Sequence, residues 1–473
     1  MRKGWVTRSK KKAAAHAIGL SPAGRFSIRG VQILTADFIC IAGIRSGVCE
    51  HRPFFSVFPD AGIADVLVFG RFFQPEIMLR QGGNMSRLKD VKWNHLVWVL
   101  VFSFGIAPFC KAQPGPNPPG KTHTYYVAAD EVEWDYAPSG MNKMMGMKFS
   151  GYPNVFVEQG PHRIGKVYRK AIYREYTDES FSTLKPRAPE WEHAGILGPI
   201  LRGEVGDTIR VVFKNNATHP YSMHPHGVFY NKDSEGSGYD DGTSGKDKED
   251  DAVPTGKTHV YTWEVPERAG PGPGDPSSVV WLYHSHEARD IESGLIGAII
   301  ITRRGMAGPD GRPKDVDREF VALYTGFDEN VSWYLDHNIQ TYTSDPKGVN
   351  KLEFTPADLD GNLSGAGTGF SAANFKFSIN GFIFGNTPMM TMKKGERVRW
   401  YLMSIGEFAS IHTPHWHGNV VVDHGKRTDV LLLGPAQMET VDMVPDDPGI
   451  WLFHCHISEH MEIGMVALYK VEP

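Results

Sequence analysis

Cysteine is scarce in this chain of 473 residues, and its placement matters more than its number. Three of the four cysteines, Cys40, Cys49 and Cys110, lie in the first quarter, so only Cys455 follows residue 112. Most of the chain can therefore form no internal disulfide, which excludes a disulfide-stapled fold. A lone cysteine in an oxidising compartment is a reactive group unless something binds it, and a metal ion would do so.

Long apolar runs are also missing. The run at 96–109 has fourteen residues, which is short for a membrane span. It follows Met85 and a basic stretch and precedes small residues, which is the layout of a secretory signal peptide. We therefore expect an upstream extension at 1–84 that is disordered or not part of the mature protein, a signal peptide at 85–112 and a secreted protein from about Gln113. An uncleaved signal anchor that holds the protein at a membrane is the alternative.

Positive charge is in short supply after the signal segment. Residues 1–112 carry 16 Lys and Arg against 6 Asp and Glu, which leaves 34 positive and 48 negative residues and a net charge of −14. A surface this acidic argues against nucleic acid as a partner and would attract small cations. Acceptor sequons at Asn216, Asn330 and Asn362 fit an exported glycoprotein.

Helical periodicity is weak from His123 onward. Short β-branched and aromatic runs, such as 208–213 and 320–324, alternate instead with clusters of Gly, Pro and Asp. This pattern is typical of an antiparallel β-sandwich. We therefore expect an all-β protein.

Two motifs occur twice. HPHG at 224–227 matches HWHG at 415–418, and WLYHSH at 281–286 matches WLFHCH at 451–456. We therefore expect one sandwich repeated in tandem. The first copy is predicted at 113–303, the second at 318–473, and the Gly/Pro-rich linker between them at 304–317.

Aligning the two copies without gaps separates two kinds of position. Four potential metal ligands of the second copy have no counterpart in the first, because His412, Cys455, His460 and Met465 fall opposite Tyr221, Ser285, Asp290 and Leu295. Eight histidines are kept in both copies: His224, His226, His284, His286, His415, His417, His454 and His456. The repeat therefore describes two different sites. Histidines outside these motifs, such as His424, are expected to be structural.

The Cys455 set has the ligand chemistry of a mononuclear copper centre. Alternate side chains of a strand face opposite sides, so Cys455 points one way and its flanking histidines the other. Two imidazoles, one thiolate and a soft thioether from Met465 suit blue copper, whereas zinc gains nothing from a long Met ligand. Eight imidazoles on the other side are too many for one ion and suit a cluster of copper ions.

Taken together, HPHG, HSH, HTPHWHG and HCHISEHMEIGM resemble the four copper motifs of the multicopper oxidases, and the similarity covers about 123–473. Flanking text such as GILGPILRGEVGD and FDENVSWYLDHNI resembles the ceruloplasmin and hephaestin branch. The resemblance implies two cupredoxin-like Greek-key sandwiches and four copper ions per functional unit. The implied ligands are His412, Cys455, His460 and Met465 for type 1 copper, His224 and His415 for type 2 copper, and His226, His284, His286, His417, His454 and His456 for the type 3 pair.

The resemblance also implies the reaction. Single electrons would enter at the type 1 copper, pass from Cys455 through His454 and His456, and reduce dioxygen to water at the cluster. Asp241, in the loop after HPHG, is a candidate proton relay, although a solvated loop aspartate is the competing interpretation. Glu459, just before His460, could help to dock a cation.

The electron donor stays open between ferrous iron and phenolic or other organic reductants. In the ferroxidase branch a Glu and a His help to hold iron near the type 1 site, and ungapped alignment puts Ala372 and Phe377 at those positions. Both residues are apolar. The local sequence therefore supports ferroxidase activity poorly.

The chain has two expected domains where ceruloplasmin has six. The resemblance implies that two-domain members of the family assemble as closed trimers, in which domain 1 of one subunit faces domain 2 of the next. We therefore expect a homotrimer with copper clusters at the subunit contacts. The rival interpretations are a two-domain copper nitrite reductase, and a copper-binding or electron-transfer module without oxidase activity.

Overall fold

The computed structural model describes residues 120–356, 367–406 and 411–473, and the backbone of six strands nearer the N-terminus. The chain divides into two compact units, Met1–Gly115 and Pro116–Pro473. The signal peptide expected at 85–112, apart from residues 85–87 in the sixth strand, lies outside the described residues. Most of the expected upstream extension and the sequon at Asn362 do so as well. The first unit contains an antiparallel sheet of β1 (Arg25–Ile28), β2 (Val31–Leu34), β3 (Ser56–Pro59), β4 (Asp65–Phe69), β5 (Glu76–Gln81) and β6 (Asn84–Arg87), in that order.

The first sandwich of the second unit is built from two four-stranded sheets whose apolar side chains share one core, which includes Val211, Trp263, Tyr283 and Ile299. One sheet has the order β10 (Val167–Tyr176), β7 (Thr122–Asp135), β12 (Thr208–Asn215) and β14 (Thr258–Glu264). The other has the order β11 (Leu201–Glu204), β16 (Ile296–Thr302), β15 (Ser278–His284) and β13 (His224–Pro225).

The second sandwich repeats this plan around a core that includes Trp400, Val441, Phe453 and Tyr469. Its larger sheet has the order β20 (Phe375–Ile379), β17 (Arg318–Asp328), β22 (Val398–Ser404), β26 (Met438–Met443), β24 (Val421–Asp423) and β25 (Lys426–Thr428). The smaller has the order β21 (Met390–Lys393), β28 (Val466–Glu472), β27 (Gly449–Cys455) and β23 (Pro414–Trp416).

The two copies have matching strand registers. His224 pairs with His284 between β13 and β15, and His415 pairs with His454 between β23 and β27. The predicted all-β fold of two tandem sandwiches is confirmed. The sheets are mixed rather than antiparallel throughout, because β12 runs parallel to β7 and β22 parallel to β17. Such parallel neighbours come from crossover connections, which strand periodicity alone does not reveal.

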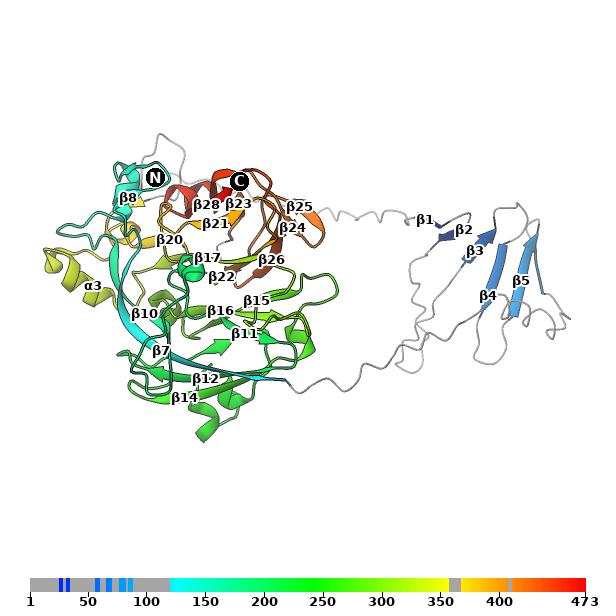
Figure 1. Cartoon of the computed structure of the whole chain (residues 1–473), viewed down its shortest axis with the longest axis horizontal. Helices are drawn as coiled ribbons and strands as arrows, with labels where there is room; N and C mark the ends of the chain where they lie inside the picture. The colour runs from blue at the N-terminus through cyan, green and yellow to red at the C-terminus, as the bar shows by residue number, and fades with distance from the viewer. Residues whose placement is uncertain are drawn as a thin grey trace, which may run out of the picture. The chain divides into compact units, whose positions relative to one another are not determined.

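The two sandwiches pack against each other within the second unit. A core cluster joins Leu282 and Ile300 of the first to Val321, Leu323 and Tyr401 of the second. Strand β15 lies against β22 and β26, and Figure 1 shows the green strands of the first sandwich beside the yellow to red strands of the second. The domain boundaries at 303 and 318 stay a prediction, since the unit is compact as a whole.

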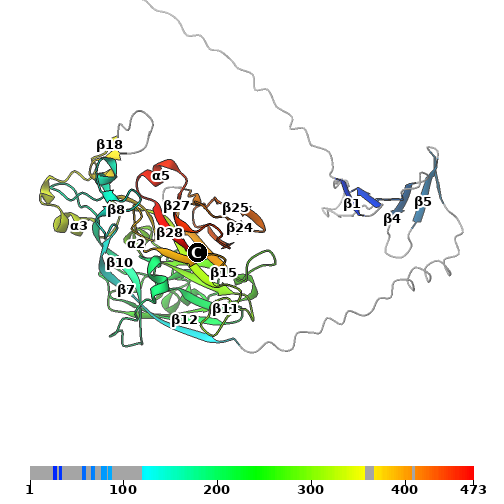
Figure 2. The same cartoon turned by 45° about the horizontal axis from the view of Figure 1, so that its top comes forward.

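Among the described residues, helices are few and short. They are α2 (Ala288–Ser293), α3 (Leu335–Tyr342), α4 (Phe370–Ala373) and α5 (Ser458–Glu462), and α5 lies beside β27 (Figure 2). Six 3-10 turns and two small hairpins, β8 (Met141–Asn142) with β9 (Met147–Lys148) and β18 (Thr355–Pro356) with β19 (Gly367–Thr368), complete the elements. In the part of the chain that the structure describes, no helix has the length and apolar character needed to cross a membrane.

Candidate metal centres

Cys455 lies at the end of β27 with two imidazoles directed at its sulfur. Its Sγ is 3.5 Å from Nδ1 of His460 and 4.0 Å from Nδ1 of His412. One ligand atom of each of the three residues lies within 4.8 Å of the others. Helix α5 turns the chain back after Cys455, which places the His460 imidazole next to the sulfur. The N–H of Met465 donates to the His460 carbonyl at 2.9 Å.

The thiol of Cys455 is prepared to act as a thiolate. Burial raises its pKa, but hydrogen bonds from His412, His460 and the backbone N–H groups of Thr413 and Ile457 outweigh burial and lower the pKa to about 6. The Thr413 N–H donates to Sγ at 3.3 Å. A thiolate is the form of cysteine that binds metal ions. His412, Cys455 and Met465 are fully buried, whereas His460 is partly exposed. Three of the four side chains are therefore shielded from solvent, and His460 is the one that a reductant could approach.

At the equivalent position of the first sandwich there are no soft metal ligands among the described residues. Polar side chains there form hydrogen bonds with one another instead. Ser285 Oγ donates to Asp290 Oδ2 at 2.6 Å, and the Trp333 indole N–H donates to Asp290 Oδ1 at 2.7 Å. Burial raises the pKa of Asp290 to about 6. Tyr221, opposite His412 in the repeat, pairs its hydroxyl with that of Tyr334 at 2.9 Å. The first sandwich therefore has a closed polar network where the second has a thiolate set.

The four histidines of the first sandwich form one group, which we call the first quartet: His224, His226, His284 and His286. The rings that contact each other have centroids 4.8 to 5.8 Å apart. His226 Nε2 and His284 Nε2 face each other at 3.1 Å. Burial lowers the pKa of His284 to about 3 and that of His226 to about 4, so both rings are neutral at physiological pH. Neutral imidazole is the form that binds metal ions.

The second quartet has the same geometry: His415, His417, His454 and His456. Their ring centroids lie 4.8 to 5.7 Å apart, and Nε2 of His417 faces Nε2 of His454 at 3.0 Å. Burial lowers the pKa of His454 to about 4. His454 and Cys455 are consecutive, so the thiolate set and the second quartet share one strand.

Backbone carbonyls orient two imidazoles in each quartet. In the first, Nδ1 of His224 donates to the Glu235 carbonyl at 2.6 Å and Nδ1 of His284 to the Ser285 carbonyl at 2.8 Å. In the second, Nδ1 of His415 and Nδ1 of His454 donate at 2.8 Å to the carbonyls of Asp429 and Cys455. A carbonyl only accepts, so Nδ1 carries the proton and the Nε2 lone pair is left for a metal ion. The donor chemistry of both quartets therefore fits copper.

The two quartets are separate within one chain. Among the described residues, ring contacts join the members of each quartet, and His224 also contacts Tyr230, but no ring contact joins one quartet to the other. His286 and His456 are exposed at the surface. Each quartet also has an exposed apolar neighbour. Phe229 follows the HPHG motif of the first quartet, and Val430 forms a β-bridge with His415 of the second. Each quartet thus has an open side.

The remaining predicted site residues lie in different settings. Asp241 is held by Lys232 at 3.0 Å and Lys248 at 2.9 Å, and hydrogen bonds from Thr243 together with these lysines hold its pKa far below the usual range. A carboxylate in that state releases and takes up no proton near neutral pH, so this geometry does not support a proton relay. Glu459 is exposed on α5, next to His460.

Apolar side chains occupy the two positions aligned with the iron-holding residues of ferroxidases. Phe377 packs its ring on His460 with a centroid distance of 4.5 Å. Ala372 is buried in α4. Of the two, Phe377 therefore touches the thiolate set directly and offers no ligand for a cation.

Several contributors to these centres were absent from the sequence-based interpretation. The carbonyls of Glu235 and Asp429 act through backbone atoms, so no side-chain type indicates them. Thr413, between His412 and His415 in HTPHWHG, donates to the sulfur through its N–H, and only its place inside the motif could have suggested a role.

Comparison with known proteins agrees with this geometry. Two family models described as multicopper oxidase match the chain, one over residues 193–305 and one over 355–473. These ranges contain both quartets and the complete Cys455 set. The chain belongs to the multicopper oxidases.

Its curated relatives define the branch. The chain is 43% identical over 356 residues to the ferroxidase HEPHL1 of Homo sapiens, covering 74% of this chain and 29% of that protein. It is 42% identical over 384 residues to hephaestin of Homo sapiens, covering 80% and 31%, and 39% identical over 398 residues to ceruloplasmin of Ovis aries, covering 83% and 37%. The chain therefore belongs to the ceruloplasmin and hephaestin branch of the family. It spans about a third of the length of these relatives.

Solved structures with similar folds include a copper nitrite reductase and a blue copper oxidase, both from Nitrosomonas europaea. The first is 18% identical with a TM-score of 0.45, over 74% of this chain and 94% of that one. The second is 16% identical with a TM-score of 0.44, over 74% and 86%. At these scores the family assignment rests on the sequence comparisons.

Proposed function

We propose that the protein is a copper-dependent oxidase that couples four one-electron oxidations of a reductant to the reduction of one dioxygen, with four protons, to two waters. The observation that carries the proposal is the shared strand β27, in which Cys455 belongs to the thiolate set and His454 to the second quartet. Copper held at these sites would alternate between its +1 and +2 states and so accept and pass on single electrons.

The residues supply the protein side of this chemistry. His412, Cys455, His460 and Met465 would hold the mononuclear copper, and His224 and His415 the type 2 copper. The type 3 pair would be held by His226, His284, His286, His417, His454 and His456. Cys455 and His454 are joined covalently and by the hydrogen bond from His454 Nδ1 to the Cys455 carbonyl at 2.8 Å. This short covalent path links the electron entry to the oxygen site.

We propose that a second copy of the chain completes each cluster. Each quartet supplies four imidazoles and has an exposed member, and the two quartets of one chain make no contact with each other among the described residues. A homotrimer in which the first quartet of one subunit meets the second quartet of the next would close three identical clusters, since head-to-tail contacts generate rings. The exposed apolar residues Phe229 and Val430 support burial of these faces.

Ferrous iron and phenolic reductants are the two donor classes for this oxidase. The named ferroxidase relative favours iron, and Glu459 offers a carboxylate beside the partly exposed His460. Against iron, Phe377 covers His460 with an apolar ring. Secretion after removal of a signal peptide, with glycosylation at the sequons, is our proposal for the route to an oxidising compartment, and N-terminal sequencing of the mature protein tests it.

Oxygen uptake by the copper-loaded protein is the direct test of the oxidase function. We expect uptake with ferrous iron or a phenol, and loss of uptake in Cys455→Ser, which removes the thiolate. Lys185→Met, which alters an exposed ion pair with Glu175 outside the copper-binding residues, serves as a control for folding. A fully copper-loaded protein without oxygen uptake would indicate a copper-binding module, and consumption of nitrite in place of oxygen would indicate a nitrite reductase.

A further inference from the structure

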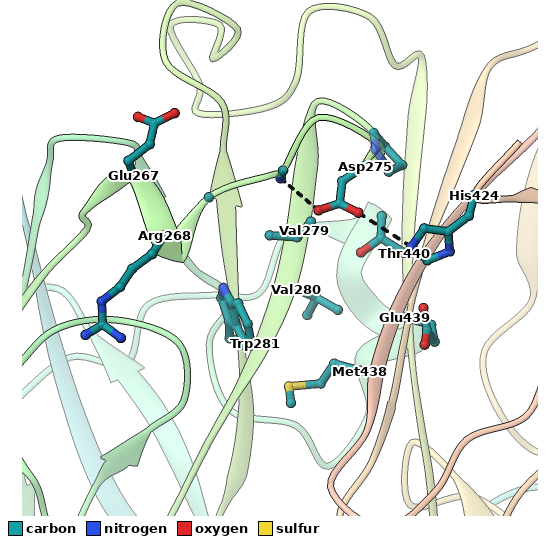
Figure 3. Close-up of a pocket in the computed structure, with 13 residues that line it drawn as sticks. Glu267, Arg268, Asp275, Val279, Val280, Trp281, His424, Met438, Glu439 and Thr440 are labelled. Atoms are coloured by element: carbon teal, nitrogen blue, oxygen red, sulfur yellow. Dashed lines mark hydrogen bonds and ion pairs between the residues drawn. The ribbon is translucent and has the colours of Figure 1, made fainter. Parts of the chain in front are cut away.

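A further group of imidazole and carboxylate side chains lies at a cavity of about 500 Å³ outside the candidate copper centres. The cavity opens between β15 with the segment that precedes it in the first sandwich and, in the second, the turn after β24 and strand β26. Val280, Trp281 and Met438 form its apolar part, and Asp275, His424 and Glu439 line it with polar groups (Figure 3).

His424 is oriented as a metal ligand would be. Its Nδ1 donates to Asp423 Oδ1 at 2.6 Å, so its Nε2 carries a free lone pair when the ring is neutral. That Nε2 faces Asp275 Oδ1 at 3.6 Å, beyond hydrogen-bond distance. A carboxylate that holds one ring nitrogen while the other faces a cation is the usual arrangement around metal-bound histidine.

The carboxylates of Asp275 and Glu439 are each held by one oxygen. Asp275 Oδ2 accepts the Gly272 N–H at 2.8 Å, which leaves Oδ1 toward His424. Glu439 Oε1 accepts from the Gln437 amide at 2.6 Å, which leaves Oε2 free. One ligand atom of each of Asp423, His424 and Glu439 lies within 4.8 Å of the others. Asp275 joins this group from the first sandwich through the 3.6 Å approach of its Oδ1 to His424 Nε2.

This cluster has an excess of negative charge. In the described part of the chain, no lysine or arginine forms an ion pair with Asp275, Asp423 or Glu439, and both aspartates face His424 instead. Burial and the neighbouring charges of Asp423 and Asp275 raise the pKa of Glu439. The nearby guanidinium of Arg303 donates to backbone carbonyls of Gly272 and Asp275 instead. A cation would relieve the repulsion among these carboxylates.

We propose that this cavity binds one divalent first-row cation through His424 Nε2, Asp275 Oδ1 and the Glu439 carboxylate, with Asp423 orienting the imidazole. One nitrogen and several oxygen ligands suit Fe²⁺, Mn²⁺ or Zn²⁺, whereas Cu⁺ favours sulfur. The bound ion joins a loop of the first sandwich to the hairpin of the second. The site is distinct from the copper centres and does not depend on the oxidase reaction.

Manganese binding to the copper-loaded protein tests the site. Free Mn²⁺ gives a six-line electron paramagnetic resonance signal at room temperature, so its loss on adding protein measures binding. We expect one Mn²⁺ per chain with the copper content unchanged. We also expect at least a roughly tenfold weaker Kd in Glu439→Gln and in His424→Asn, because loss of even an outer-shell partner of a metal ligand weakens metal binding by about 10- to 100-fold.

His162→Asn is the matched control, since His162 is an exposed histidine paired with Asp345 at 3.0 Å but belongs to no three-residue cluster among the described residues. We expect its Mn²⁺ affinity to equal that of the unaltered protein. The His424 side chain is 60% exposed, so its variant should fold, and circular dichroism checks this. Absence of Mn²⁺ binding, equal affinity in all variants, or release of copper as Mn²⁺ binds would each overturn the proposal.

Discussion

The ionisation of Cys455 is a property of the thiolate set that can be measured without turnover. Hydrogen bonds to its sulfur lower the pKa to about 6 from an ordinary 9.0. In the copper-free protein at pH 7 we therefore expect about ten thiolates for each thiol, against about one thiolate per hundred for an unperturbed cysteine. His460→Ala removes one of the groups that stabilise the thiolate and should move the midpoint upward.

The same shift predicts a pH-dependent stability. The folded pKa is lower than the unfolded one, so the stabilisation is complete above the unfolded pKa and is lost as the pH falls through the folded pKa. With pKa values of about 6 and 9, the thiolate contributes about 1.4 kcal/mol at pH 7 and almost nothing at pH 5. Because the histidines titrate in both proteins, the contribution is the difference between the unaltered protein and Cys455→Ser.

Thiolate absorbance near 240 nm, measured as the unaltered protein minus Cys455→Ser, gives the midpoint directly. Urea unfolding of the same two copper-free proteins at pH 5 and pH 7 gives the stability difference. A midpoint at pH 8 or above, or a difference in stability that does not grow from pH 5 to pH 7, would show that the imidazoles do not prepare the sulfur for a metal ion.

Two further predictions concern the packing between the sandwiches and the choice of donor. Lys170 and Glu329 form a fully buried ion pair. Lys170→Met should therefore lower the free energy of unfolding by about 3–5 kcal/mol, because the buried Glu329 carboxylate loses its cationic partner. Lys185→Met breaks the exposed pair with Glu175 and should change the free energy of unfolding by less than about 1 kcal/mol in the same urea titration. The double variant Ala372→Glu/Phe377→His should raise kcat/KM for ferrous iron relative to a phenol by roughly tenfold, equivalent to about 1.4 kcal/mol of added cation binding; equal changes for both donors in steady-state assays would count against a cation-docking role for this surface.

The sequence predicted the repeated sandwich and both quartets because spacing carries the relevant information. In HPHG, HWHG, HSH and HCH the histidines are two residues apart, so a strand directs both to one side. The pairing of His415 with His454 and of His224 with His284 is a finding of the structure, because periodicity fixes the side a residue faces but not its partner on another strand. The loss of ligands in the first sandwich was also visible, since Ser285 stands in place of Cys455.

Long-range contacts limited the rest of the prediction. Asp241 stood out as an acidic residue after a copper motif, but its ion pairs with Lys232 and Lys248 depend on how the loop folds. His424 was expected to be structural because it belongs to no repeated motif, and its partner Asp275 lies in the other sandwich, about 150 residues earlier. Side chains that meet only through domain packing leave no local pattern.

Subunit complementation tests the central claim most directly, which is that each oxygen site is built by the first quartet of one chain and the second quartet of another. His226→Ala disables the first quartet and His417→Ala the second, so each variant alone should be inactive when copper-loaded. If the two are unfolded, mixed in equal amounts and refolded together, random assembly should restore about a quarter of the oxygen uptake, because one contact in four joins two intact quartets. No recovered uptake in mixed trimers, or full activity in a monomer by light scattering, would contradict the account.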